Sequence, residues 1–174
     1  MNLVLTNPAG AYLGPQETAV LTILKENYPA WKFAHFGTNA NNSAIAGDLA
    51  DPDADRIPNL LEYAMASDPN ASGTEGTVTG AIFANHFQLH LRRNTSATNI
   101  TYIVQAANTL GSWADVMTYT AATGWVTNTA GATFSESAVI GTPPDAYVNV
   151  TVTDPTPVDA PGANSRFFRF VVHR

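Results

Sequence analysis

In the first third of the chain, hydrophobic residues recur every three or four positions, which predicts short helices. Val20, Leu24 and Tyr28 lie one helical turn apart, and Pro29 is expected to end the helix that carries them. A second helix is expected to end at Gly37, because glycine commonly follows the last helical turn. The predicted helices cover residues 17–28, 30–36 and 58–66.

Beyond residue 77 the hydrophobic period changes to two, which is typical of strands with one buried face. Phe87, Leu89 and Leu91 alternate with polar residues, and the same alternation recurs at 102–106, 147–152 and 167–172. Short strands separated by turn residues, with no helices between them, predict an antiparallel β-sandwich of the immunoglobulin or jelly-roll kind. We therefore expect an α+β fold, with a helical unit over residues 1–72 and a sandwich over 73–174.

Composition restricts the partners that such a chain can bind. The chain has 174 residues, a formal net charge of −6 and only two lysines, which disfavours nucleic acid and anionic membrane surfaces. No apolar run approaches the roughly 18 residues of a membrane span, and the first residues do not resemble a signal peptide. Cysteine is absent, which removes disulfides and thiolate metal sites.

The strongest chemical signal is an acidic loop over residues 51–62. Calcium in an EF-hand-like loop takes oxygens from positions 1, 3, 5, 7, 9 and 12, the seventh through a backbone carbonyl. The residues at these positions are Asp51, Asp53, Asp55, Ile57, Asn59 and Glu62. The sequence therefore predicts a Ca²⁺ site, and a single unpaired loop indicates a structural clip.

One position of this loop departs from the usual pattern. Position 6 is normally glycine because the turn needs a positive φ, yet Arg56 stands there, at a cost of about 1 kcal/mol. The alternative interpretation is a solvated acidic loop whose carboxylates cap the following helix.

Several short motifs resemble those of a known group of proteins. They are Ala30-Trp31, His35-Phe36-Gly37, Asn59-Leu60-Leu61-Glu62-Tyr63-Ala64, Ser67-Asp68-Pro69, Leu110-Gly111-Ser112-Trp113 and Arg166-Phe167-Phe168-Arg169-Phe170. Together with the acidic loop, they resemble C-terminal modules of large secreted proteins of Verrucomicrobia and Planctomycetes, whose calcium loop is similar to those of dockerins and thrombospondin type 3 repeats. The resemblance covers about residues 30–174, and it implies an extracellular or cell-surface location and an accessory role.

Three aromatic residues of the sandwich are candidates for ligand binding. Trp113, Tyr119 and Trp125 follow one another in its threonine-rich middle part. Exposed aromatic rings stack on sugar rings, so these residues indicate a carbohydrate-binding surface. Packing within a turn or the core is the alternative, above all for Trp113.

No catalytic motif is present, and we do not expect an enzyme. The chain lacks a G-x-S-x-G elbow, a glycine-rich phosphate loop and an H-E-x-x-H helix. Two functions remain open. One is a non-catalytic calcium-binding module that binds polysaccharide or a cell-surface glycan. The other is a structural subunit of a filament or surface layer that self-assembles through an N-terminal segment containing Leu3-Val4-Leu5.

Overall fold

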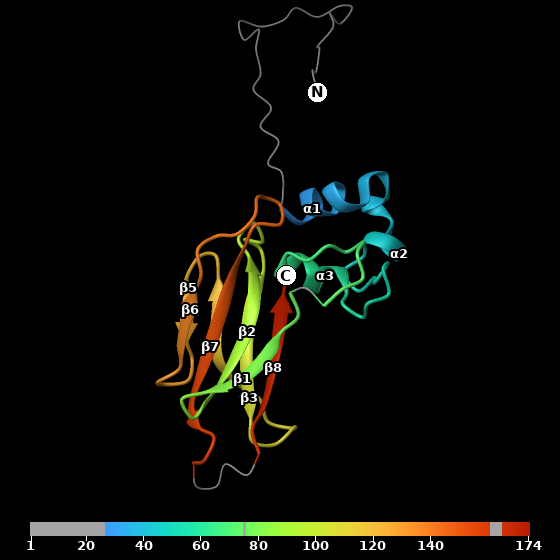
Figure 1. Cartoon of the computed structure of the whole chain (residues 1–174). Helices are drawn as coiled ribbons and strands as arrows, with labels where there is room; N and C mark the ends of the chain where they lie inside the picture. The colour runs from blue at the N-terminus through green and yellow to red at the C-terminus, as the bar shows by residue number, and fades with distance from the viewer. Residues whose placement is uncertain (1–26, 75, 161–164) are drawn as a thin grey trace, which may run out of the picture.

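The computed structural model describes residues 27–74, 76–160 and 165–174. Its helices are α1 (Asn27–Phe36), the 3-10 helix η1 (Gly37–Asn41), α2 (Ser43–Ala46) and α3 (Asn59–Met65). Its strands are β1 (Thr79–Phe83), β2 (His86–Asn94), β3 (Thr101–Ala107), β4 (Ala114–Thr120), β5 (Gly124–Thr127), β6 (Thr133–Glu136), β7 (Tyr147–Pro157) and β8 (Phe167–His173). The helices gather at one end of the strands (Figure 1), which confirms the predicted α+β fold.

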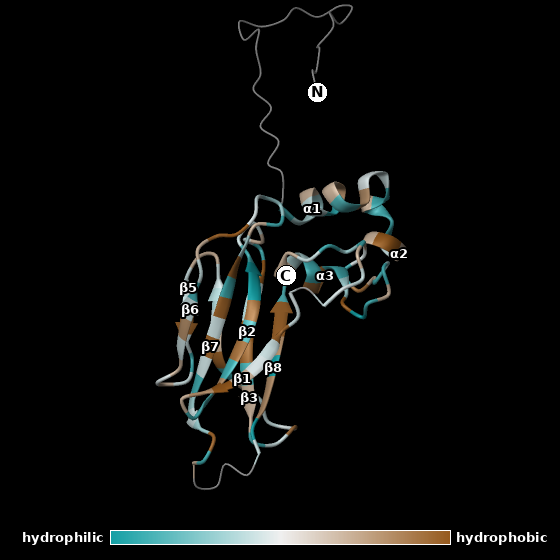
Figure 2. Ribbon diagram, viewed as in Figure 1, coloured by the Kyte–Doolittle hydropathy of each residue, from teal (hydrophilic) through white to brown (hydrophobic). Residues whose placement is uncertain are grey.

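The strands form two four-stranded sheets in the orders β1-β2-β7-β6 and β5-β4-β3-β8. All neighbouring strands are antiparallel. Hydrophobic and polar residues alternate along β2 and β7 (Figure 2) and along β3 and β8, and one face of each sheet packs against the other sheet. The predicted antiparallel sandwich is therefore confirmed.

The first helix differs from the prediction at Pro29. Helix α1 begins at Asn27 and runs through Pro29 to Phe36, whereas we expected Pro29 to separate two helices. Proline is tolerated in the first turn of a helix because the amide it lacks has no partner there. Residues 17–26 of the helix expected over residues 17–28 lie outside the described residues, and so does the Leu3-Val4-Leu5 segment.

Helix α3 agrees closely with the helix predicted over residues 58–66. It ends where Ala66 turns into the left-handed region, with φ of 54°. In the described part of the chain, no helix has the length and apolar character needed to cross a membrane.

The helical unit and the sandwich share one continuous core. Tyr28, Trp31 and Tyr63 are fully buried and belong to the same cluster as Tyr102 and the inner faces of both sheets. Side chains of the sandwich also bind the backbone of α3. Asn94 Nδ2 donates to Tyr63 O (2.9 Å), and Tyr102 Oη donates to Ala64 O (2.8 Å). These bonds fix α3, and with it Glu62, against the sandwich.

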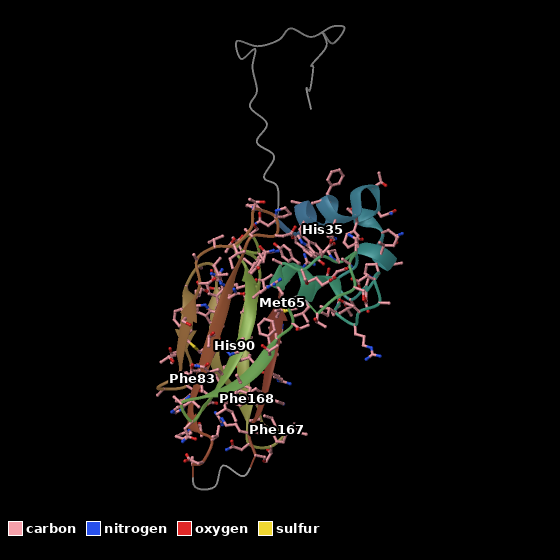
Figure 3. All side chains as sticks on the ribbon, in the orientation of Figure 1. His35, Met65, Phe83, His90, Phe167 and Phe168 are labelled. Atoms are coloured by element: carbon pink, nitrogen blue, oxygen red, sulfur yellow. The ribbon has the colours of Figure 1, made fainter. Side chains whose placement is uncertain are left out.

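The two open sides of the sandwich differ. On one side β5 and β6 are joined by Trp125, whose Nε1 donates to Glu136 Oε1 (2.7 Å). On the other side Phe87 of β2 stacks on Phe168 of β8, with ring centroids 3.9 Å apart, while every residue of β1 is exposed. Phe83, at the end of β1, is 68% exposed (Figure 3).

Candidate metal centre

The acidic loop winds tightly between α2 and α3. Backbone hydrogen bonds from Asn59 N to Ala50 O (2.9 Å) and from Leu60 N to Asp48 O (3.1 Å) close its base. Arg56 has a φ of 77°, so the left-handed turn expected at position 6 is present. Ala54 also has a positive φ, 62°, which the spacing of the aspartates did not reveal.

Three aspartates converge inside this loop. Oxygens of Asp51, Asp53 and Asp55 all lie within 4.8 Å of one another. Backbone amides hold them in place: Asp55 N donates to Asp51 Oδ1 and Asp53 Oδ1 (both 3.2 Å), and Ile57 N donates to Asp55 Oδ1 (2.7 Å). Three carboxylates held this close repel one another strongly unless a cation lies between them.

Glu62 places a buried carboxyl group at the end of the same loop, in the first turn of α3. The residue is 1% exposed, and Oε2 has no hydrogen-bond partner. Burial, and then the charges of Asp53, Asp55, Asp51 and Asp68, raise the pKa of Glu62 to about 8. A buried carboxyl oxygen without a donor is costly, and either a proton or a cation reduces that cost.

A second orphaned oxygen belongs to Asp53. Its Oδ2 is buried without a hydrogen-bond partner. Burial, which outweighs the hydrogen bond from Asp55 N, raises the pKa of Asp53. In residues 27–74, 76–160 and 165–174, no lysine or arginine forms an ion pair with the three loop aspartates or with Glu62. The three loop aspartates and Glu62 therefore have no lysine or arginine counter-ion within the described residues.

The remaining predicted ligands have other contacts. Asn59 is fully buried, and its Nδ2 donates to Ile45 O (2.8 Å) and Gly47 O (2.9 Å) while Oδ1 has no partner. Its amide thus ties the start of α3 to the end of α2. The Ile57 side chain lines an apolar cavity with Leu61 and Phe168, and its carbonyl belongs to the acidic loop.

The three aromatic residues predicted to bind a ligand lie in two separate places. Tyr119 and Trp125 are paired across β4 and β5, with ring centroids 5.3 Å apart, and Phe134 lies 5.8 Å from Trp125. Trp113 lies apart from them, at the start of β4. Its Nε1 donates to Leu110 O (3.1 Å), and the Arg169 guanidinium lies 4.3 Å from its ring.

An ion pair beside Trp125 was not predicted from the sequence. Arg93 donates through Nε and Nη2 to the two oxygens of Glu136 (2.9 and 3.0 Å), and its guanidinium lies 4.0 Å from the Tyr119 ring. Burial alone would raise the pKa of Glu136, but hydrogen bonds from Arg93 and Trp125 hold it below its usual value. Arg93 and Glu136 are 43 positions apart, so only the fold brings them together.

The histidines do not form a shared site. His86 Nδ1 is 2.9 Å from Asp154 O, and His90 Nδ1 is 3.0 Å from Thr151 Oγ1. His35 on α1 and His90 on β2 lie in different parts of the molecule (Figure 3). His35 Nε2 is 3.1 Å from Asp145 Oδ1, which also accepts a hydrogen bond from Trp31 Nε1 (2.9 Å).

Known proteins add nothing further to this geometry. The resemblance stated from the motifs, to secreted modules with a dockerin-like or thrombospondin type 3-like loop, stays a prediction. No family model, curated protein or solved structure matched the chain.

Proposed function

We propose that the chain is a non-catalytic, extracellular calcium-binding accessory module in which the ion fastens the acidic loop to α3. The observation that carries this proposal is Glu62 Oε2, which is buried without a hydrogen-bond partner at the end of the loop that holds three converging aspartates. A cation supplies the positive charge that no lysine or arginine of the described residues brings to these groups.

The donor set favours a hard cation. Every candidate side-chain ligand offers oxygen, and Ca²⁺ takes about six to eight oxygens at roughly 2.3–2.6 Å in flexible geometry. Mg²⁺ demands a stricter octahedron and gives up its water reluctantly, so a wound loop of carboxylates suits it less well. The residues that would hold the ion are Asp51, Asp53, Asp55 and Glu62, with the Ile57 carbonyl and Asn59 as further candidates.

The position of α3 supports a structural role for the ion. Residues Tyr63 and Ala64, directly after Glu62, accept hydrogen bonds from Asn94 and Tyr102 of the sandwich. Neutralising Glu62 would therefore stabilise the part of α3 that joins the helical unit to the sheets.

Calcium titration tests the proposal. We expect the metal-free chain to bind Ca²⁺ by isothermal titration calorimetry, and its melting temperature to rise when Ca²⁺ replaces a chelator. Asp51→Asn should weaken this binding, whereas Asp159→Asn, the same change at a distant turn, should leave it unaltered. Absence of binding heat, with the same melting temperature in Ca²⁺ and in chelator, would contradict the proposal.

The accessory role we propose is binding of polysaccharide or a cell-surface glycan at the β5 and β6 edge. Three aromatic rings gather there: Tyr119 and Trp125 are partly buried against the core, and Phe134, which is 45% exposed, extends the cluster to the surface. Affinity electrophoresis in gels containing xylan, laminarin or pectin measures this binding. We expect retardation in at least one gel that Trp125→Ala abolishes and Trp113→Ala preserves. Unretarded migration in all three gels would contradict this part of the proposal.

A further inference from the structure

A cavity of about 360 Å³ lies next to Glu62 and has walls from two segments of the chain. Asp55 and Glu62 line it from the acidic loop and α3. Ser67, Asp68 and residues 71–73 line it from the segment that follows α3. Since a water molecule occupies roughly 30 Å³, this cavity has room for a cation with several waters.

The second wall offers oxygens that are not used elsewhere. Ser67 Oγ is buried without a hydrogen-bond partner. Asp68 Oδ1 accepts a hydrogen bond from Asn70 N (3.0 Å) and lies 3.5 Å from His35 Nδ1, contacts that orient the carboxylate. Within the described parts of the chain, Asp68 Oδ2 takes part in no hydrogen bond or ion pair, which leaves it for a ligand in the cavity.

The two walls already touch. Gly73 N donates to Asp55 Oδ2 (3.3 Å), so the segment after α3 reaches a carboxylate of the acidic loop. Asp68 lines the same cavity as the buried Glu62. Asn59, the ligand expected at position 9, does not line this cavity.

We infer that Ser67 and Asp68 complete the coordination shell of the cation, directly or through water, from the side opposite the acidic loop. This inference rests on the proposed calcium site and adds to it a ligand group that the 12-residue loop pattern does not contain. The three aspartates, the Ile57 carbonyl and a bidentate Glu62 would supply about six oxygens, which leaves one or two positions for the second wall. The ion would then hold residues 67–73 as well as the acidic loop.

Calcium affinity of the whole chain tests this inference. Asp68→Asn is the sharpest variant, because asparagine keeps an oxygen to accept from Asn70 N while it removes the charge. We expect its dissociation constant for Ca²⁺ to rise at least about tenfold, since ligand charge sets affinity in such sites. Ser67→Ala should weaken binding by a smaller factor. Asp159→Asn, an equal change of net charge at a distant turn, should stay within about twofold of the unaltered chain.

Hydrogen exchange gives a second measurement that needs no variant. Calcium should slow exchange of the amides of residues 70–73 in the unaltered chain, and this protection decides the matter if Asp68→Asn does not fold. Unchanged affinity of Asp68→Asn, or unchanged exchange at 70–73 in a chain that binds Ca²⁺, overturns this inference alone. A chain that binds no Ca²⁺ overturns the proposed function as well.

Discussion

Arg56 has a φ of 77° at the loop position that usually holds glycine. A side chain in the left-handed region costs about 1 kcal/mol, and arginine adds a positive charge to the same segment as the proposed ligands, although its guanidinium forms no ion pair with them in the described residues. We expect Arg56→Gly to tighten calcium binding by relieving both. Arg56→Gln removes only the charge, so its affinity should lie between those of the unaltered chain and Arg56→Gly. Calorimetric titration of the three proteins checks this order, and an Arg56→Gly variant that binds no more tightly would refute it.

The Glu62 carboxyl should make the stability of the metal-free protein depend on pH. Its pKa is about 8 in the fold and near 4.5 in the unfolded chain, so the folded state holds the proton more tightly. Stability is then greatest below about pH 4.5 for this group and falls as pH rises towards 8.

In chelator, the melting temperature should therefore fall as the pH rises from 4.5 to about 8, the range that these two pKa values enclose. Glu62→Gln should remove most of this fall, because glutamine does not ionise. Saturating Ca²⁺ should also remove it, because the ion stabilises the ionised form. Equal slopes for Glu62→Gln and the unaltered chain in chelator would show that another group causes the pH dependence.

At the scale of elements, the sequence predicted the strands in which hydrophobic and polar residues alternate, and it did not predict the strands that lack this alternation. The runs that include Leu89, Tyr102, Val150 and Phe170 predicted β2, β3, β7 and β8, because each buries one face. Strands β1 and β6 are exposed along their whole length, and β5 has only four residues, so none has an alternating pattern to read. In β4 the register shifts opposite Val104 and Gln105, which interrupts the period of two.

The same distinction applies to the candidate site. The three aspartates follow one another at fixed spacing, so the sequence alone predicted that they converge. Ser67 and Asp68 are brought to Glu62 by the turn after α3, and Glu136 is brought to Trp125 where β6 of one sheet faces β5 of the other. Contacts of this kind depend on the fold and have no local spacing that predicts them.

The closure of the sandwich by β5 and β6 should depend on Glu136. This carboxylate binds Arg93, which is 8% exposed, and Trp125. Removing its charge leaves a largely buried guanidinium without a counter-ion, so Glu136→Gln should lower the free energy of unfolding by about 1–3 kcal/mol. Urea unfolding measures the loss, with Ser135→Ala on the same strand as the control. A Glu136→Gln variant as stable as this control would mean that the ion pair contributes little.

At the scale of the whole molecule, β1 is the surface most suited to self-association. It carries no charge, its backbone edge is free of a neighbouring strand in the described residues, and Ile82 and Phe83 are 66% and 68% exposed. Uncharged exposed edges pair readily with other strands. This surface supports the alternative of a self-assembling structural subunit, although its contact would differ from one made by Leu3-Val4-Leu5.

Light scattering during size-exclusion chromatography tests this alternative. If β1 mediates self-association, the apparent mass should rise with protein concentration, and Ile82→Lys should keep the chain monomeric by placing a charge on the edge. Val139→Lys, at a similarly exposed apolar residue outside the strands, is the control and should not suppress association. A mass that stays monomeric at every concentration would reject an interface at β1.

The core shared between the helical unit and the sandwich also limits where gene recombination can divide the chain. Recombination between genes succeeds at joints that leave each side able to fold, and residues 67–77 contain the turn chemistry of a typical joint. A crossover there would part Tyr63 from Asn94 and Tyr102, and would leave Tyr28 and Trp31 without the surface that buries them. The helical unit and the sandwich should therefore pass between genomes together, as a single cassette.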